Sequence, residues 1–370
     1  MEPEKKYMLR VIELAKKGMG FVNPNPMVGA VIVKDDRIIG EGFHCRCGEL
    51  HAERDAFSRL KEDAKGATVY VTLEPCCHYG KQPPCTEAII EHGIKRVIIG
   101  SRDPNPLVAG KGARLLREKG IEVIEDFLKD ECDELNPSFF HYITTGKPYV
   151  VLKYAMTIDG KIATGTGASK WITGEKAREH VHGLRGRYSA ILAGIGTVLS
   201  DNPMLNCRLC GEDGQAAHQP LRVIADSNLR IPLDSNIVLT ADRFPTLVAA
   251  GDLSGKEDKL AALREAGVQV ISIPDKDNRV DLKALMDYLG EHRIDSVLIE
   301  GGGKLCWSAV KSGIVNHVSA YIAPKIFGGA GALTPVEGEG VEIPGDALQL
   351  KFEKMSSIGD DILLEYEVID

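Results

Sequence analysis

The hydrophobic pattern of the first part of the chain alternates between helical and strand periods. Apolar positions recur at helical spacing in residues 4–17, whereas two apolar runs at 28–33 and 37–43 flank Asp35-Asp36 and predict a β-hairpin. Further helices are expected at 52–61, 86–92, 112–119 and 127–144, and further strands at 68–73, 96–100 and 121–124. Alternating β and α units favour a mainly parallel sheet with helices on both faces.

A second α/β pattern follows the Gly and Pro of segment 145–148, which predict a domain boundary. Strands are expected at 149–156, 190–193, 221–225, 246–250 and 296–300, and helices at 175–183, 256–265 and 282–289. Residues 200–219 are polar and irregular. Strands at 315–323, 350–356 and 362–368 are expected to be antiparallel and to close the sheet. The sequence therefore predicts two different α/β domains, residues 1–146 and 147–370.

Composition and charge narrow the function classes. The 370 residues are 44% apolar and 26% charged, the balance of an ordinary globular protein. The 45 Lys and Arg against 53 Asp and Glu give a net charge of −8, which disfavours a nucleic-acid partner but allows a small anionic ligand held by a few arginines. No apolar run approaches the ~18 residues of a membrane helix, and the N-terminus has no secretory pattern, so we expect no membrane partner. Nine cysteines, an odd number, favour free thiols or thiolate–metal bonds in the cytoplasm.

Histidines and cysteines crowd into residues 44–85. His51-Ala52-Glu53 starts a predicted helix, Cys76 directly follows a strand, and Cys85 leads into another helix. One imidazole and two thiolates, from His51, Cys76 and Cys85, supply three zinc ligands and leave the fourth position open for water. Both cysteines lie near helix starts, where free backbone N–H groups stabilise thiolates. Glu53 can shuttle protons between that water and a leaving group without binding the metal.

Other metal arrangements remain open at this stage. A closed structural zinc site would use Cys77 or His78 as a fourth ligand. Cys45 and Cys47 form a C-x-C pair, but alternate residues of a strand end do not favour one shared site, so we interpret it as incidental. Cys207 and Cys210 mimic half of a zinc knuckle, and the sequence has no second C-x-x-C, so their thiols are also interpreted as incidental.

The motifs that contain His51, Cys76 and Cys85 resemble the H-x-E and P-C-x-x-C signature of zinc-dependent cytidine deaminases. The spacing differs, because eight residues separate Cys76 from Cys85 where the signature has two. The stretch TLEPCCHYGKQPPCTEAI, with NPNPMVGAVIV upstream and RDPNPLVAGKG downstream, resembles the bifunctional deaminase–reductases of bacterial riboflavin synthesis. That resemblance covers the whole chain. It implies a cytidine-deaminase-like αβα domain followed by a dihydrofolate-reductase-like α/β domain.

The resemblance also implies a substrate pocket in the first domain. Its residues would be Asn25, His44, Lys81, Asp103 and Asn105. Asn and Asp side chains can read the amide-like edge of an aminopyrimidinone, and Lys81 with His44 would meet a ribose phosphate. From the residues alone, Asn25 and Asn105 are equally well explained as turn formers before Pro26 and Pro106.

In the second half, the predicted strand 296–300 runs into Gly301-Gly302-Gly303-Lys304, a strand–glycine turn–helix arrangement that can cradle a pyrophosphate. The motifs KYAMTIDGK, SKWIT and GIGTVLSDNP resemble the reductase domain of the same family, which uses NADPH. Cofactor contacts are implied for Ala155, Trp171, Thr197, Asp201, Gly302, Gly303, Lys304, Leu305, Cys306, Trp307 and Ser308. Substrate contacts are implied for Ser169, Arg185, Leu205, Arg208 and Glu300, and Lys153, Asp201 and Glu300 are open candidates for steering hydride transfer. From the residues alone, Trp171 is equally a core residue, and the alternative for Arg185 is a solvated helix face, for which Arg187 alongside is an equal candidate.

The function that this resemblance implies is a zinc-dependent hydrolytic deamination of 2,5-diamino-6-(5-phosphoribosylamino)pyrimidin-4(3H)-one. An NADPH-dependent reduction of the ribosyl side chain would follow. One zinc ion per chain and a homo-oligomer, a dimer or tetramer, are expected. Two rival hypotheses are a zinc deaminase that acts on a base in RNA and a nucleotide-sensing module with structural zinc.

Overall fold

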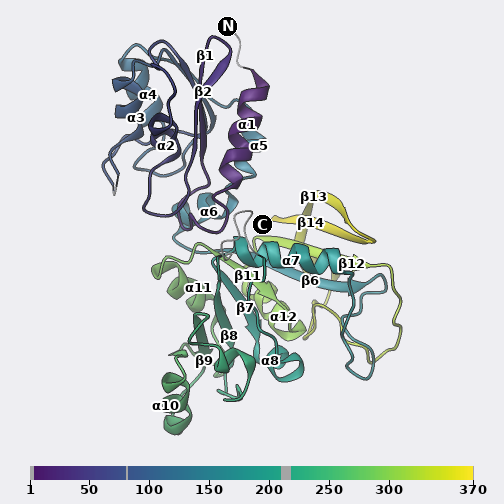
Figure 1. Ribbon diagram of the computed structural model, residues 1–370. Coiled ribbons are helices and arrows are strands. Elements are labelled where there is room, and N and C mark those ends of the chain that lie inside the picture. Colours follow the sequence, from purple (N-terminus) through teal and green to yellow (C-terminus); the bar gives the residue numbers. More distant parts are fainter. Residues whose placement is uncertain (1–3, 81, 210–217, 370) are drawn as a thin grey trace. The chain divides into compact units, whose positions relative to one another are not determined.

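The computed structural model describes residues 4–80, 82–209 and 218–369 (Figure 1). The chain divides into two compact units, Met1–Gly146 and Lys147–Asp370, and each contains its own sheet and its own hydrophobic cores. Within the described ranges, no helix combines the length and the apolar character that a membrane span requires.

The first unit is built on a five-stranded sheet of order β2-β1-β3-β4-β5. Its elements are α1 (Lys5–Lys16), β1 (Gly29–Lys34), β2 (Arg37–Phe43), α2 (Ala52–Ser58), β3 (Thr68–Leu73), α3 (Cys85–Glu91), β4 (Arg96–Ser101), α4 (Lys111–Glu118), β5 (Glu122–Ile124), α5 (Lys129–Asp133) and α6 (Pro137–Thr145). Alternate residues of β1 pack into hydrophobic cores on opposite faces of the sheet. Ala30 and Ile32 of β1 pack toward α2, α3 and α4, whereas Val31 and Val33 pack toward α1 and α5. Figure 1 shows these helices on the two faces of the sheet.

Two predictions for this unit were wrong in detail. The sheet is mixed rather than mainly parallel, because β1 pairs antiparallel with both β2 and β3, and only β3, β4 and β5 run parallel. The helix expected at 127–144 is two helices, α5 and α6. Asn136 separates them because its buried side chain hydrogen-bonds both backbone groups of Met27, at 2.7 and 2.9 Å, and Pro137 then starts α6.

The second unit contains a nine-stranded sheet of order β10-β9-β8-β7-β11-β6-β12-β14-β13. Its elements are β6 (Tyr149–Thr157), α7 (Glu175–Arg187), β7 (Ala190–Gly194), α8 (Ile195–Asp201), β8 (Leu221–Ala225), α9 (Asn236–Leu239), β9 (Thr246–Ala250), α10 (Glu257–Glu265), β10 (Gln269–Ser272), α11 (Leu282–Glu291), β11 (Ser296–Glu300), α12 (Gly303–Ser312), β12 (His317–Ala323), η1 (Pro344–Asp346), β13 (Gln349–Ile358) and β14 (Asp361–Ile369). Residues of α11 and α12 pack on one face of the sheet, and residues of α7, α8, α9 and α10 pack on the other.

The predicted closing strands were only partly right. β12 is parallel to β6, and only β14 and β13 are antiparallel additions at the edge. The short helices α8 and α9 and the strand β10 were not predicted. In both units, parallel strands bring their carboxyl ends to one edge of the sheet, where α/β proteins usually bind ligands. At that edge Lys153 of β6 stands directly opposite Glu300 of β11.

Candidate functional sites

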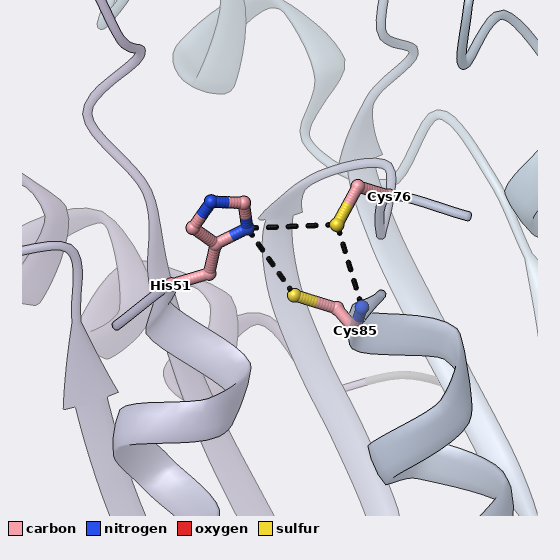
Figure 2. A group of neighbouring side chains, drawn as sticks. All are labelled: His51, Cys76 and Cys85. Carbon is pink, nitrogen blue, oxygen red and sulfur yellow. Dashed lines mark hydrogen bonds between the residues drawn. The ribbon is translucent and has the colours of Figure 1, made fainter. Parts of the chain in front are cut away.

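Three metal-ligating side chains meet at the carboxyl end of β3 (Figure 2). The ligand atoms of His51, Cys76 and Cys85 all lie within 4.8 Å of one another. His51 Nδ1 is 3.5 Å from each sulfur, and both sulfurs face the same edge of the imidazole ring. Imidazole nitrogen and thiolate sulfur are the ligands that zinc prefers, so this donor set fits a zinc ion with one position left for water.

The local sequence explains how these three residues converge. His51 is the N-cap of α2, Cys85 is the first residue of α3, and Cys76 lies just beyond the end of β3. The backbone N–H of Cys85, a free donor of the first helical turn, donates to Cys76 Sγ at 3.4 Å. The two helix starts therefore aim one imidazole and one amide at the same sulfur.

The two thiols compete for a single negative charge. Hydrogen bonds from Cys85 and His51 lower the pKa of Cys76 to about 4 against the opposing effect of burial. The hydrogen bond to Cys76 and burial both raise the pKa of Cys85. Two neighbouring sulfurs become thiolates together only beside a cation, which is a second indication that the cluster is built for a metal.

Glu53 lies beside this cluster in a buried position, with 4% of its surface exposed. Burial raises the pKa of its carboxyl group, and negative charge at Cys76 raises it further. A carboxyl group with a raised pKa is suited to accept and return a proton near neutral pH. Glu53 is outside the set of three converging ligand atoms.

The closed-site alternative has no geometric support among the residues that the structure describes. There, the only His, Cys, Asp and Glu cluster of metal-binding geometry is the set of three, without Cys77 or His78. Cys45 donates to the Phe43 carbonyl at 3.7 Å and also lies outside the cluster. Cys207 is buried and donates to the His182 carbonyl, whereas Cys210 lies outside the described residues.

Two of the residues expected in the first substrate pocket, Asn25 and His44, lie beside the candidate metal ligands. His44 is buried and its ring lies edge-on to the ring of His51, with centroids 5.5 Å apart. Its Nδ1 contacts the Leu50 carbonyl at 2.9 Å, so Nδ1 carries the proton and Nε2 accepts from Asn25 Nδ2 at 3.1 Å. Burial lowers the pKa of His44, which keeps it neutral. Asn25 and His44 are thus a hydrogen-bonded pair next to the metal ligands.

Asp103 and Asn105 lie in the loop after β4. Burial raises the pKa of Asp103 to about 6, and its Oδ1 accepts from the Asn105 backbone N–H at 2.8 Å. The side chain of Asn105 accepts from the Leu107 N–H at 3.0 Å, so the turn-forming alternative describes Asn105. Lys81 lies outside the described residues.

Sequence reasoning missed two residues that support this site. The buried Glu74 accepts hydrogen bonds from the N–H groups of Gly110 and Ala113, and so ties the start of α4 to the strand end before Cys76. Arg54, directly after Glu53, donates to the carbonyls of Pro83 and Pro84 at 2.9 and 2.8 Å. A charged residue after an apolar strand was a usable signal for Glu74, but nothing in the sequence identifies the partners of Arg54.

A buried charge cluster lies at the carboxyl edge of the second sheet. Arg185 of α7 forms a bidentate pair with Glu300, with Nε–Oε1 2.6 Å and Nη2–Oε2 2.9 Å. Lys153 Nζ is 3.9 Å from Glu300 Oε2. Burial alone would raise the pKa of Glu300, but the two cations lower it to about 2, whereas burial lowers the pKa of Lys153. The solvated-face alternative for Arg185 is therefore wrong, and its guanidinium fork is already paired with a carboxylate.

The glycine turn after β11 has the geometry of a ligand cradle. Gly301 and Gly302 have φ values of 87° and 89°, and a Cβ at either position would lie 3.4 Å from Thr197 Oγ1. This close approach, together with the N–H groups at the start of α12, fits the pyrophosphate of a nicotinamide dinucleotide. Leu305 and Cys306 are buried in the core, so only their backbone can face a cofactor. The side chain of Ser308 donates to the Lys304 carbonyl within α12.

Six further predicted residues of the second unit differ in their surroundings. Trp171 is 63% exposed with Arg178 over its ring, so the core-packing alternative is wrong. Ser169 Oγ donates to Asp201 Oδ1 at 3.5 Å, which joins one predicted substrate residue to one predicted cofactor residue. Three further predicted residues are Ala155, which packs against α7, the buried Leu205 and the exposed Arg208.

Two family models match the chain. The model of the cytidine and deoxycytidylate deaminase zinc-binding region matches residues 1–101, and the model of the RibD C-terminal domain matches residues 148–364. The first match contains all three candidate metal ligands. The second contains the charge cluster and the glycine turn.

Full-length relatives agree with both models. The riboflavin biosynthesis protein RibD of Actinobacillus pleuropneumoniae is 55% identical over 98% of this chain and 95% of its own length. The structure of Acinetobacter baumannii RibD is similar with a TM-score of 0.86 at 38% identity, over 99% of this chain and 98% of that one. A diaminohydroxyphosphoribosylaminopyrimidine deaminase/5-amino-6-(5-phosphoribosylamino)uracil reductase of Thermotoga maritima has a TM-score of 0.85 at 41% identity, over 98% of both chains. The chain therefore belongs to the RibD family of bifunctional riboflavin biosynthesis enzymes, in which a zinc-binding deaminase domain precedes a reductase domain.

Proposed function

We propose that the first unit hydrolyses 2,5-diamino-6-(5-phosphoribosylamino)pyrimidin-4(3H)-one at its 2-amino group and that the second unit reduces the ribosyl side chain of the product to ribityl. The convergence of three metal-ligating atoms within 4.8 Å, beside the buried Glu53, carries the proposal. The Thermotoga maritima relative is named for both activities.

In the first unit, His51, Cys76 and Cys85 would hold one zinc ion per chain. Zinc in such a site lowers the pKa of a coordinated water to near neutrality. Glu53 accepts a proton from the attacking water and delivers protons to the ring nitrogen and to the leaving amine, so that one C–O bond forms, one C–N bond breaks and ammonia leaves. Asn25 and His44 are joined to each other beside this centre and would orient the pyrimidine.

In the second unit, NADPH would supply a hydride to the ribosyl C1′ after ring opening. The glycine turn at the start of α12 would hold its pyrophosphate, with Thr197 packed against the turn. Arg208, exposed on the loop after α8, would meet the substrate phosphate, because the Arg185 fork is paired with Glu300. Lys153 and Glu300 lie at the same sheet edge and would face the reacting sugar.

The proposal also includes a cytoplasmic location and a homo-oligomeric assembly. No disulfide joins the cysteines that the structure describes, which suits a reducing cytoplasm. A homo-oligomer, dimer or tetramer, is expected from the family resemblance. Light scattering of the purified protein measures the assembly state directly.

Purified protein tests the proposal through its Glu53→Gln variant. We expect about one zinc per chain in both proteins, ammonia release from the pyrimidine phosphate by the unaltered chain, and loss of that release in Glu53→Gln. NADPH oxidation should require the deaminated intermediate and should persist in Glu53→Gln when that intermediate is supplied. Ammonia release from a tRNA anticodon stem instead, full activity of Glu53→Gln, or turnover with NADH alone would contradict the proposal.

A further inference from the structure

The side-chain amide of Asn136 holds the chain next to a predicted substrate residue of the first unit. Asn136 Oδ1 accepts from the backbone N–H of Met27 at 2.7 Å, and Asn136 Nδ2 donates to the Met27 carbonyl at 2.9 Å. Both residues are buried. The N–H and the carbonyl belong to two successive planar peptide units, so the amide fixes the orientation of the chain on both sides of the Met27 Cα.

The sequence makes the segment before Met27 stiff. Asn25 lies between Pro24 and Pro26, and each proline ring fixes its own φ at about −65°. A proline also restricts the residue before it, which here is Asn25. The Asn25 N–H donates to the Val22 carbonyl at 2.8 Å, which closes a turn. A displacement of Met27 is therefore passed on to Asn25 rather than absorbed between them.

Two hydrogen bonds join the same segment to His44. Asn25 Nδ2 donates to His44 Nε2 at 3.1 Å, and the Val28 carbonyl accepts from the His44 backbone N–H at 2.9 Å. His44 Nδ1 in turn donates to the Leu50 carbonyl, directly before His51, and the two imidazole centroids are 5.5 Å apart. The segment therefore sets where both the backbone and the ring of His44 lie relative to a candidate zinc ligand.

The ordinary role of an asparagine at this position does not explain its side chain. Asn136 is the N-cap of α6, where an asparagine side chain usually accepts a hydrogen bond from the first turn of its own helix. Here the side chain makes no capping bond, and both of its polar groups bond to Met27, 109 residues away. The amide has exchanged a local contact that would stabilise α6 for one that holds the segment of Asn25.

We propose that Asn136 is a positioning residue of the deaminase site, which holds Asn25 and His44 where they orient the pyrimidine. Asn136 acts through Met27, because its own side chain is buried and both of its polar groups are bonded there. The inference rests on the proposed deamination and adds a determinant of its substrate affinity outside the pocket. Since Glu53 and the metal ligands lie on other elements, the expected effect is on KM rather than on kcat.

The test uses the full chain and the steady-state rate of ammonia release from the pyrimidine phosphate. Asn136→Leu keeps the approximate volume of the side chain and removes both bonds to Met27. We expect KM to rise about tenfold, with kcat and the zinc content nearly unchanged. Asn136→Asp keeps the acceptor for the Met27 N–H and loses the amide donor to its carbonyl, so KM should rise less than in Asn136→Leu.

Ile12→Ala is the matched control for loss of stability. Ile12 of α1 is buried in the same hydrophobic core as Met27, and its truncation removes apolar contacts without touching the Met27 backbone bonds. Ile12→Ala should lower the Tm of the first unit, as Asn136→Leu does, and should leave KM unchanged. General weakening of the unit and displacement of the substrate residues thus give different results.

A double-variant cycle tests whether Asn136 acts through Asn25. Asn25→Ala alone should raise KM, because Asn25 would orient the pyrimidine. Once that side chain is gone, the loss of its support matters little, so Asn136→Leu/Asn25→Ala should raise KM no more than about twofold further. A residue that only stabilises the fold would change KM by the same factor in both backgrounds.

The outcomes separate this inference from the proposed function. An unaltered chain that releases no ammonia contradicts the deamination itself. With an active unaltered chain, the inference is overturned if Asn136→Leu keeps its KM, if it loses kcat or zinc instead, if Ile12→Ala raises KM equally, or if the effects of Asn136→Leu and Asn25→Ala multiply. If Asn136→Leu fails to fold, Asn136→Asp and its combination with Asn25→Ala decide the result by the same criteria.

Discussion

The pair of Arg185 and Glu300 offers a direct test of how the second unit holds its charges. The side chains are 15% and 7% exposed, and two short hydrogen bonds join them. Arg185→Met keeps the length of the side chain and removes all of its donors. The carboxylate of Glu300 then stays buried, with Lys153 Nζ at 3.9 Å as the remaining cation.

The expected cost follows from this geometry. Removing one partner of a buried ion pair costs about 3–5 kcal/mol, because the other charge is left without compensation. Lys153 offsets part of that loss, so we expect about 3 kcal/mol. For a domain of this size, that corresponds to a fall in Tm of about 6–12 °C. The double variant Arg185→Met/Glu300→Gln removes the unpaired carboxylate but leaves the buried Lys153 without its anion, so it should recover only part of the loss.

The pH dependence has a defined sign. The pKa of Glu300 is lowered to about 2 from its ordinary 4.5, so the pair contributes stability that is fully present above pH 4.5 and is lost as the pH falls toward 2. In Arg185→Met the pKa of Glu300 rises, since burial is opposed by less positive charge. The variant is then most destabilised at neutral pH. The difference in stability between the two proteins should narrow as the pH falls through the variant's pKa.

Differential scanning calorimetry of the full chain measures these effects on the transition of the second unit. Arg187→Met is the control, because Arg187 lies on the same helix and its guanidinium contacts the Tyr188 ring at 5.9 Å. We expect that control to lose no more than about 1 kcal/mol. Equal Tm values for the two methionine variants, or no recovery in the double variant, would refute the reasoning.

Three further predictions concern the metal centre. Arg54→Met should lower the zinc affinity measured against a chelator about 10–100-fold, because the segment before a metal ligand loses its anchor, whereas Arg59→Met, at the C-cap of the same helix, should bind zinc as the unaltered chain does. Gly112→Ala places a Cβ 2.1 Å from the Pro75 carbonyl and should lower both zinc affinity and the Tm of the first unit, whereas Gly165→Ala, whose Cβ meets nothing within 4 Å, should change neither. Chelation of the zinc should abolish ammonia release and leave NADPH oxidation of the deaminated intermediate intact, and loss of both activities would contradict separate sites.

Much of the grouping of the three candidate metal ligands was predictable because its information is local. His51 and Glu53 are two residues apart at a helix start, and Cys85 follows two prolines that begin another helix. Short spacing of this kind fixes which side chains share a helix end before the fold is known. The approach of the three ligands to one another depends on the tertiary fold, because 25 and 34 residues separate His51 from Cys76 and Cys85. The apolar run at 68–73, shortly before Cys76, already indicated a strand end.

The second unit was less predictable because its contacts are remote in sequence. Arg185 and Glu300 are 115 residues apart, so periodicity could not distinguish a solvated arginine from a buried one. The same limit applies to Asn136, whose buried side chain bonds to Met27 across 109 residues and interrupts a helix that the apolar pattern makes continuous. Each of these residues is fixed by a partner that only the tertiary fold supplies.

The net charge of −8 does not reflect the local charge at the carboxyl edge of the second sheet. Long-range attraction to a polyanion depends on the summed surface charge, and here the acidic excess opposes it. At the edge of the second sheet, by contrast, Lys153 and Arg185 surround the single carboxylate of Glu300, and all three are largely buried. Two cations against one anion leave the cluster positive where solvent screening is weak. An acidic protein can therefore be a poor partner for nucleic acid and still carry a local excess of positive charge at a small buried cluster.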